Sequence, residues 1–252
     1  HDAWRNRLIW GDNKLVMASL LKEFKGKIDL IYIDPPFDVG ADFTMDVPIG
    51  DGKETVGKDQ STLEMVAYRD MWGKGTDSYL HMMFERLLLM KELLSEKGSI
   101  YVHCDWRMSP HLRALMDEVF GKENFRNELY WYYYNKMHDA RKPIFPRATD
   151  TILFYARSAS LGTTFNRQKE DRETAVRQLV RKKVGGKMVN ARDDEGNVLY
   201  RDAIDRTVDN VWRIPMLQPA DKTQNLAYAT QKPEALIERI ISTLFERRRS
   251  RR

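Results

Sequence analysis

The stretch KIDLIYIDPPFDVG, residues 27–40, decides how this chain is organised. Its apolar run at residues 28–33 is typical of a strand in a parallel sheet that is covered on both faces. The run ends at Asp34, which is followed by two prolines and a phenylalanine. Because ligands of open α/β sheets bind at the carboxyl ends of the strands, we expect a functional site at Asp34.

The Asp34-Pro35-Pro36-Phe37 segment has the chemistry needed to bind an aromatic amine. Proline has a fixed φ and no N–H, so the two prolines predict a stiff turn whose carbonyl groups can accept hydrogen bonds. The Asp34 carboxylate is a second acceptor, and Phe37 offers a flat apolar face. Two acceptors on an exocyclic amine favour a tetrahedral nitrogen with a nucleophilic lone pair. We interpret the segment as a site of amine alkylation, driven by positioning and electrostatics, although a plain strand-ending turn is the alternative.

Alternating helices and strands are predicted on either side of this segment. Apolar periodicity and end signals predict helices from Asp12 or Asn13 to about Phe24, from Asp77 or Ser78 to Gly98, from Ser109-Pro110 to Gly121, and from Pro233 onward. Strands are predicted at residues 8–10, 99–104, 128–134 and 151–156, the last two as antiparallel neighbours. This alternation is typical of a doubly wound α/β sheet.

The chain divides into three predicted regions. Residues 1–156 form the catalytic core, and residues 216–252 return to it with a helix and a basic tail. Between them, residues 157–215 are polar and charged, and we interpret them as a small insertion with a helix at 171–182 and a turn at KVGGK. Residues 38–62 are predicted to form a long loop that closes over the ligand, because loops of this length are usually functional or disordered.

Composition excludes several classes of protein. The 252 residues are 42% hydrophobic and 31% charged, which suits a globular chain. No apolar run approaches the roughly 18–20 residues of a membrane span, and no signal peptide is evident, so a cytoplasmic location without membrane association is expected. The single cysteine excludes an internal disulfide and a cysteine zinc cluster, and no metal site is expected. The net charge is +5, but the last seven residues hold five arginines and one glutamate. Nucleic-acid binding must therefore be argued from local patches.

Seven ordered segments resemble the DNA amino-methyltransferases of the permuted β class. The chain is most similar to the modification subunits of type III restriction systems and their solitary relatives. The segments are LIWGDN, KIDLIYIDPPFDVG, YRDMWGKGTDSYLHMMFERLLLMKELLSEKGSIYVHCDWR, LMDEVFGKENFRNELYW, TDTILFYARS, DNVWRIP and YATQKPEALIERII. The resemblance implies a Rossmann-like, circularly permuted sheet that binds S-adenosylmethionine as methyl donor. It also implies double-stranded DNA as the substrate, with a flipped base as the methyl acceptor.

The same resemblance implies roles for individual residues. Asp34 and the Pro35 carbonyl would accept from the target amine, Pro36 would complete the turn, and Phe37 would stack on the base. An Asp at the first position resembles adenine-N6 enzymes; cytosine-N4 members more often begin with Ser, and cytosine N4 is the alternative target. The resemblance also implies that the TQKPE segment lies near the carboxylate of the methyl donor, with Gln231, Lys232 and Pro233 as contacts; a simple helix start is the alternative. Asp34 is expected at the donor as well, and Asp12, which follows the first predicted strand, is expected to border the same pocket.

Three residues at the end of the predicted strand 99–104 have competing interpretations. His103 and Asp105 either line the site or form a satisfied structural pair. Cys104 could serve as the nucleophile of a cytosine-C5 methyltransferase, but it lies within a strand and lacks a preceding proline turn. We therefore interpret Cys104 as a buried structural thiol.

Two segments are predicted to contact DNA. Residues 131–147 interleave aromatic and basic side chains, which suit base stacking and phosphate contacts. The candidates are Tyr132, Tyr134, Lys136, His138, Arg141, Lys142 and Arg147. With a period of two, either Trp131 and Tyr133 or Tyr132 and Tyr134 should be buried. Residues 165–206 hold eleven Lys/Arg against eight Asp/Glu, which indicates a target-recognition region or a solvated helix and turn.

The sequence departs from the family's pattern at one place. In β-class enzymes the last predicted helix is followed by a strand and a glycine-rich turn that holds the methyl donor, whereas no glycine follows Gly196 here. Three explanations stay open: the sequence omits part of a longer protein, a second chain supplies the turn, or the chain is a non-catalytic DNA-binding subunit. A homodimer partner is a further possibility.

Overall fold

The computed structural model describes residues 6–36, 45–49, 54–58, 76–137, 143–226 and 230–244. Its core is a mixed five-stranded sheet with the strand order β1-β4-β6-β5-β11. In this order the strands are β1 (Ile28–Ile33), β4 (Leu94–Cys104), β6 (Thr149–Ala156), β5 (Phe125–Tyr132) and β11 (Val211–Arg213). The pairs β1–β4 and β5–β11 are parallel, and β6 runs antiparallel to both of its neighbours, as predicted for β5 and β6.

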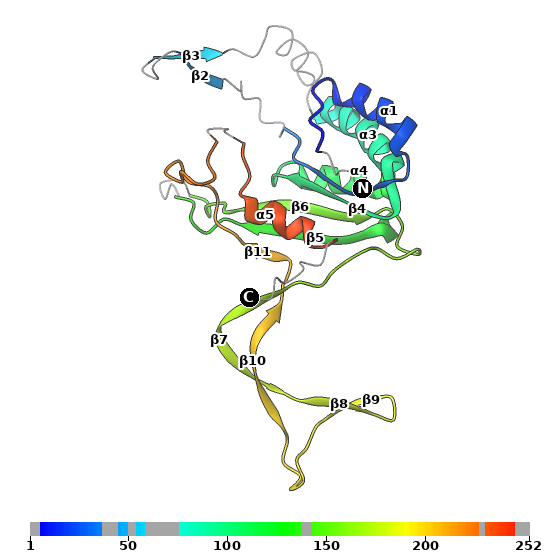
Figure 1. Ribbon diagram of the computed structural model, residues 1–252, viewed down its shortest axis with the longest axis vertical. Coiled ribbons are helices and arrows are strands. Elements are labelled where there is room, and N and C mark those ends of the chain that lie inside the picture. Colours follow the sequence, from blue (N-terminus) through cyan, green and yellow to red (C-terminus); the bar gives the residue numbers. More distant parts are fainter. Residues whose placement is uncertain are drawn as a thin grey trace.

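Helices cover both faces of this sheet (Figure 1). On one face lie α1 (Asn13–Phe24), α3 (Thr76–Leu93) and α4 (Ser109–Phe120), followed by the short helix η1 (Lys122–Asn124). On the other face lies α5 (Glu234–Ile241). Side chains of β4 alternate between the two cores, so Val102 packs toward α3 and α4 while Tyr101 packs toward α5. The predicted α/β class is confirmed.

Local signals explain the ends of two helices. The Asp12 side chain caps α1 by accepting from the backbone N–H groups of Lys14 and Leu15 at 2.9 and 3.1 Å. Helix α4 has a proline in its first turn and ends at Gly121, whose φ of +94° favours glycine. Both helices were predicted from these signals.

Two predicted elements near the core are wrong. Residues 8–10 do not form a strand, and Leu8 is fully exposed, because no strand among the described residues pairs with this segment. Helix α3 ends at Leu93, so Gly98 does not terminate it but lies within β4. A Cβ atom on Gly98 would lie 2.8 Å from the carbonyl oxygen of Ile28, so close packing between β4 and β1 requires the glycine.

A long two-stranded ribbon, which we call the arm, extends away from the sheet (Figure 1). It pairs β7 (Lys169–Leu179) with β10 (Tyr200–Thr207) and carries the hairpin of β8 (Arg181–Val184) and β9 (Lys187–Asn190). The predicted helix at 171–182 is therefore wrong, because pairing with β10 overrides the local preference for a helix. The predicted turn is confirmed at Gly185 and Gly186. Although β11 falls within residues 157–215, it belongs to the core sheet.

Residues 38–62, predicted to be a loop, contain a hairpin. Strands β2 (Met45–Ile49) and β3 (Glu54–Lys58) pair antiparallel, and the remainder of this stretch lies outside the described residues. The prediction that it closes over a ligand stays untested. None of the described helices is long and apolar enough to cross a lipid bilayer.

Candidate functional site

Asp34 lies at the carboxyl edge of the sheet, directly after β1. Ile33 is paired with Val102, so the same register places Asp34 level with His103 on the neighbouring strand β4. The Asp34 Oδ2 atom accepts a hydrogen bond from the ammonium group of Lys232, and Oδ1 lies 3.8 Å from His103 Nδ1. The side chains of Asp34 and Lys232 are 22% and 14% exposed. The carboxylate therefore faces a cation on one side and an imidazole on the other in a partly buried position.

A buried polar network extends behind Asp34. His103 has no exposed surface; its Nδ1 lies 2.9 Å from the Tyr32 hydroxyl and its Nε2 lies 3.4 Å from Asp150 Oδ2. The Tyr133 hydroxyl donates to Asp150 Oδ1 at 3.3 Å. Burial raises the pKa of Tyr32 far above its usual value, and the nearby carboxylates of Asp34 and Asp150 raise it further. Tyr32 thus stays a protonated phenol, and the network fixes the position of the imidazole beside Asp34.

Asp34 and the two prolines line a cavity of 460 Å³. The other lining residues come from the end of β1, the start of α1 and α3: Ile33, Gly11, Asp12, Asn13, Met82, Met83, Arg86 and Met90. Arg86 is only 6% exposed and donates from Nε to Asn13 Oδ1 at 2.6 Å; one of its terminal nitrogens lies 3.9 Å from Asp12 Oδ2. The cavity therefore combines carboxylates, a guanidinium group and methionine walls, which suits a zwitterionic ligand with an apolar body.

The other residues predicted at the methyl-donor end hold the segment before α5. Gln231 accepts from the backbone N–H of Leu226 at 2.8 Å and donates to the Gln224 carbonyl at 2.7 Å. Pro233 is the N-terminal cap residue of α5. Together they orient Lys232, whose ammonium group reaches Asp34 and also donates to the Thr230 carbonyl at 3.1 Å.

The contacts of Asp105 and the burial of Cys104 favour structural roles for both residues. The Asp105 carboxylate accepts from the backbone N–H groups of Arg107 and Met108 at 3.0 and 3.1 Å, and from Arg107 Nε at 2.6 Å. These bonds stabilise the turn that leads into α4. Cys104 is fully buried, and burial is the main cause that raises the pKa of its thiol far above its usual value. A thiol of this kind is a poor nucleophile, which favours the structural interpretation.

Aromatic and cationic side chains gather near the same edge of the sheet. Trp131 and Tyr133 are buried while Tyr132 and Tyr134 are exposed, which confirms that one of the two pairs faces inward. Lys136 lies over the Tyr133 ring. The predicted residues Phe37, His138, Arg141 and Lys142 lie outside the described part of the chain.

Trp106, which the sequence analysis did not select, belongs to this surface. Its side chain is 52% exposed, and the Arg147 guanidinium carbon lies 3.8 Å from its ring centroid. Tyr32, Arg86 and Asp150 were also missed, since no local pattern distinguishes them from structural residues.

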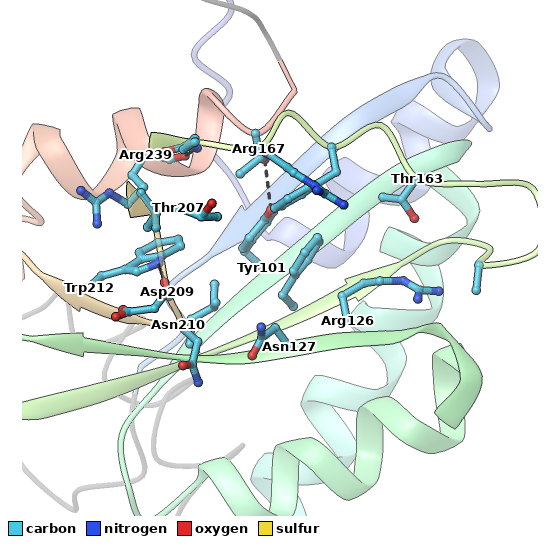
Figure 2. Close-up of a pocket in the computed structure, with 17 residues that line it drawn as sticks. Tyr101, Arg126, Asn127, Thr163, Arg167, Thr207, Asp209, Asn210, Trp212 and Arg239 are labelled. Atoms are coloured by element: carbon cyan, nitrogen blue, oxygen red, sulfur yellow. Dashed lines mark hydrogen bonds between the residues drawn. The ribbon is translucent and has the colours of Figure 1, made fainter. Parts of the chain in front are cut away.

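A second and larger cavity, of 650 Å³, lies on the face covered by α5 (Figure 2). It is lined by Tyr101 and Trp212 and by side chains near the amino end of β5, including Arg126. Because β5 runs in the same direction as β1, this cavity lies toward the opposite edge of the sheet from Asp34. The sequence analysis did not predict it.

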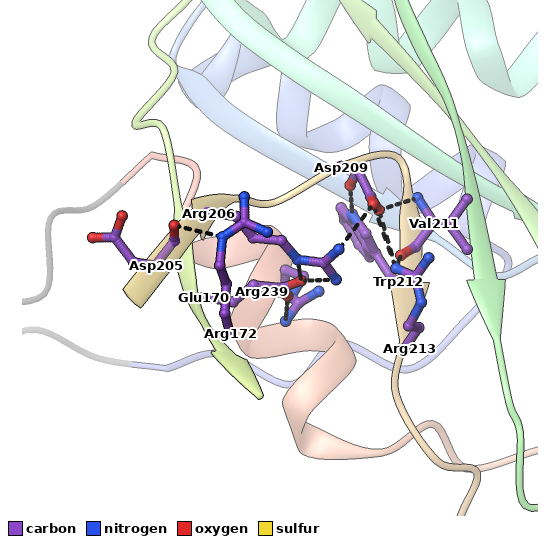
Figure 3. Close-up of polar contacts among 9 residues, drawn as sticks. All are labelled: Glu170, Arg172, Asp205, Arg206, Asp209, Val211, Trp212, Arg213 and Arg239. Atoms are coloured by element: carbon purple, nitrogen blue, oxygen red, sulfur yellow. Dashed lines mark hydrogen bonds and ion pairs between the residues drawn. The ribbon is translucent and has the colours of Figure 1, made fainter. Parts of the chain in front are cut away.

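Ion pairs anchor the root of the arm to α5 (Figure 3). Glu170 of β7 lies 2.6 Å from an Arg206 nitrogen on β10 and 3.4 Å from an Arg239 nitrogen on α5. Asp209 accepts from the backbone N–H of Val211 at 2.9 Å, where the chain enters β11. The arm is therefore attached to both the sheet and the helix that follows Lys232.

Comparisons with known proteins identify the family to which this chain is similar. The family described as DNA methylase matches residues 28–248. The Type II methyltransferase M.EcaI of Enterobacter cloacae is 35% identical over 152 residues, which are 60% of this chain and 29% of that protein. The probable type III restriction-modification enzyme HindVI Mod subunit of Haemophilus influenzae is 36% identical over 122 residues, 48% of this chain and 13% of that one. The chain thus spans less than a third of the length of these curated relatives.

A solved structure shares the fold. The M1.HpyAVI–SAM complex superposes with a TM-score of 0.51 at 14% identity, covering 93% of this chain and 74% of that one. At this level of identity the likeness supports the Rossmann-like arrangement of the sheet and helices alone.

Proposed function

The chain belongs to the DNA methylase family, and on this premise we propose that it transfers a methyl group from S-adenosylmethionine to the N6 amine of an adenine flipped out of double-stranded DNA. One observation carries the proposal: the Asp34 carboxylate lies at the carboxyl end of β1, beside two prolines, and lines a 460 Å³ cavity. Ligands of α/β sheets bind at this edge.

The residues of this cavity fit the methyl donor. When bound, S-adenosylmethionine supplies an electrophilic methyl group on a sulfonium centre. Its amino-acid end carries one amino group, which the Asp12 carboxylate would bind, and one carboxylate, which the cations of Arg86 and Lys232 would bind. The methionines of α3 offer apolar walls for the remainder of the molecule.

Asp34 and Pro35 would act on the acceptor amine. Hydrogen bonds from the amine to the Asp34 carboxylate and the Pro35 carbonyl hold the nitrogen with its lone pair directed away from the base. As the amine forms its new bond to the methyl carbon, the bond from that carbon to the donor's sulfur would break with its electron pair staying on sulfur, and the proton that the amine must then lose would pass to the Asp34 carboxylate. Phe37 is proposed to stack on the flipped base, which returns roughly 1–3 kcal/mol of the cost of flipping.

His103 is proposed as a positioning residue in this reaction. It lies between Tyr32, Asp34 and Asp150 and has no exposed surface, so its ring has one orientation beside the carboxylate. A fixed carboxylate needs no reorganisation when the amine is alkylated.

The DNA duplex is proposed to contact two surfaces. One is the aromatic and cationic surface of Trp106, Tyr132, Tyr134, Lys136 and Arg147 near the Asp34 edge. The other is the arm, because an antiparallel ribbon fits the major groove and the β8–β9 hairpin carries Arg181, Lys182, Lys183 and Lys187. Residues 157–215, apart from β11, would thus act in target recognition, and a cytoplasmic location is proposed together with DNA as the substrate.

A partner that completes the sheet is also proposed. Among the described residues, β1 pairs with β4 on one side and with no strand on the other, although its residues IDLIYI are almost all apolar. Most of these side chains are only partly buried. A further segment of a longer protein or a second chain would pair with the other side of the edge strand β1 and would bring a glycine-rich turn to the methyl donor.

Cytosine-N4 methylation is the second candidate function. The match to a family that includes both chemistries allows it, but the Asp at the first position of the Asp34-Pro35-Pro36-Phe37 segment favours adenine.

Nucleoside mass spectrometry of mixed-sequence duplex DNA tests the proposal. The DNA is incubated with the purified chain and isotopically methyl-labelled S-adenosylmethionine, and Asp34→Ala serves as the inactive control. Labelled N6-methyladenine that disappears with Asp34→Ala is expected, whereas labelled N4-methylcytosine would identify the second candidate. If no labelled base forms, and the chain also fails to bind S-adenosylmethionine, the enzymatic proposal for this chain is wrong.

A further inference from the structure

The second cavity has an aromatic wall with one open end. The rings of Tyr101 and Phe154 stack with centroids 4.4 Å apart and an interplanar angle of 6°. Phe165 lies 6.0 Å from Phe154 at 25° and is 50% exposed, whereas Tyr101, Phe154 and Trp212 are buried. The stack therefore ends in a ring with an accessible face, against which another flat ring can pack.

The rim of the same cavity carries positive charge that the structure leaves available. Arg126 donates one hydrogen bond to the Glu123 carbonyl at 3.3 Å. None of the ion pairs formed within the described residues involves Arg126 or Arg167. Arg239, by contrast, is paired with Glu170. The guanidinium groups of Arg126 and Arg167 can therefore bind an anionic ligand without breaking an existing ion pair.

The single acid of the cavity lining does not cancel this charge. The Asp209 carboxylate accepts from the backbone N–H of Val211 at 2.9 Å and lies 3.4 Å from an Arg213 nitrogen. Figure 2 shows Arg126, Thr163 and Arg167 toward one side of the cavity, Arg239 and Trp212 toward the other, and Tyr101 between them. The cavity thus has a cationic end and an aromatic middle.

We propose that this cavity binds a nucleotide, with the base stacked on Phe165 and the phosphate held by Arg126 and Arg167. Aromatic rings stack on any base, and guanidinium groups bind phosphate in a bidentate manner. The volume of 650 Å³ lies in the range of small-ligand sites. A neutral apolar ligand would leave the two arginines unpaired. The arginine-rich sequence at residues 246–252 has the same sign of charge as the rim and is disfavoured as an occupant.

This site is separate from the proposed methyl-transfer site. Asp34 follows the carboxyl end of β1, whereas Arg126 lies at the amino end of β5, which runs in the same direction. The nucleotide could be a free mononucleotide or a nucleotide within a DNA strand. Both sources share the same ring and phosphate chemistry, so the experiment must distinguish them.

Isothermal titration calorimetry with the whole chain tests the site. Adenosine 5′-monophosphate is the first probe, adenosine is the uncharged control, and a short single-stranded oligothymidylate represents a DNA strand. We expect the monophosphate to bind at least about tenfold more tightly than adenosine, since the phosphate adds charge-assisted hydrogen bonds. Tighter binding of the oligothymidylate than of the monophosphate would assign the site to a DNA strand, and the reverse would assign it to a free nucleotide.

Variants link the binding to this cavity. The double variant Arg126→Gln/Arg167→Gln should lower affinity for the monophosphate to that for adenosine, and Phe165→Ala should weaken both ligands about tenfold. Arg7→Gln is the matched control, because Arg7 is an exposed arginine that lies over the ring of Phe24 in α1; it should change the affinity for neither ligand. Circular dichroism melting establishes that each variant folds.

Either of two results would overturn the proposal. One is the absence of binding by both the monophosphate and the oligothymidylate to the unaltered chain at millimolar concentration. The other is binding that the double variant and Phe165→Ala leave unchanged. Asp34→Ala should abolish methylation while leaving monophosphate binding intact, so the failure of one proposal is distinguishable from the failure of the other.

Discussion

Asn at position 34 would test the proposed acceptor role with little change in volume. In the structure, Oδ2 of Asp34 accepts from the Lys232 ammonium group and Oδ1 faces His103 at 3.8 Å. In Asp34→Asn, the amide should turn its oxygen toward Lys232, because a cation cannot accept from an NH2 group. The NH2 group then lies on the other side, where the carboxylate would have accepted from the target amine. The substitution thus replaces an acceptor with a donor and removes the group that takes the proton.

The expected loss follows from these two effects. Removing one preorganised hydrogen-bonding group from a catalytic site typically costs about 10²–10³ in rate. Losing a general base costs about 10²–10⁴, and the two overlap because one carboxylate serves both roles. We expect methyl transfer to slow by about 10³-fold, which corresponds to roughly 4 kcal/mol of barrier. The substitution also removes the ion pair between Asp34 and Lys232, which is partly buried. The free energy of unfolding should therefore fall by only about 1–2 kcal/mol.

Single-turnover methylation at saturating DNA and S-adenosylmethionine measures this rate, and fluorescence anisotropy measures DNA affinity in parallel. Glu92→Gln is the matched control, because it removes a carboxylate from a surface ion pair with Lys25 at 2.9 Å, remote from Asp34. A rate for Asp34→Asn within tenfold of the unaltered chain, with normal DNA affinity, would refute the proposed role. An equal loss in Glu92→Gln would point to a general effect of charge.

Three further predictions concern DNA binding and stability. Replacing Lys182, Lys183 and Lys187 of the exposed β8–β9 hairpin with Gln should reduce the slope of log affinity for DNA against log salt concentration by about 3. Fluorescence anisotropy from low to physiological salt measures this slope, and an unchanged slope would show that the hairpin does not contact DNA. Trp106→Ala should weaken DNA binding by about tenfold, through loss of an exposed ring that stacks with Arg147, and should leave the melting temperature within a few degrees. Burial raises the pKa of Tyr101 to about 12, above the value of 10.0 expected for the unfolded chain. The neutral phenol therefore stabilises the fold below pH 10, and up to about 3 kcal/mol is lost as the pH rises from 10 to 12, so Tyr101→Phe should show a smaller loss of stability over this interval in denaturant titrations.

Local patterns predicted the core of the fold because its elements carry their own signals. The apolar run of β1 and the proline and glycine that bound α4 each act within a few residues. The arm was predicted wrongly for the opposite reason. The sequence of β7, KEDRETAVRQL, contains many good helix formers, and its extended conformation depends on register with β10, which follows it by more than twenty residues. Gly98 was wrongly predicted to end a helix for a similar reason, because it allows a close approach to the Ile28 carbonyl of another strand.

In the candidate site too, local sequence predicted some residues, whereas others come together only in the folded chain. Asp34 could be predicted because acid, prolines and aromatic residue are adjacent in sequence. Its neighbours could not be predicted together, because Tyr32 and His103 are 71 residues apart and Lys232 is 198 residues from Asp34. Asp150 lies in TDTILFYARS, a segment that resembles the family, but nothing local singles it out, and it reaches His103 through the antiparallel register of β6 beside β4 and β5. These contacts arise from topology, which a local pattern does not contain.

Helix α5 connects the arm to the carboxylate. Lys232 lies two residues before the helix and binds Asp34, while Arg239 near its end pairs with Glu170 at the root of the arm. The helix has eight residues, a length of about 12 Å, and Leu236 and Ile240 hold it against the sheet. We expect a helix of this length to move as a unit, so that a displacement at the arm root also shifts Lys232, whose ammonium group lies beside Asp34. The same element therefore contacts both the proposed DNA-reading arm and the proposed catalytic carboxylate, and we expect recognition of the duplex to reach the proposed site of methyl transfer through it.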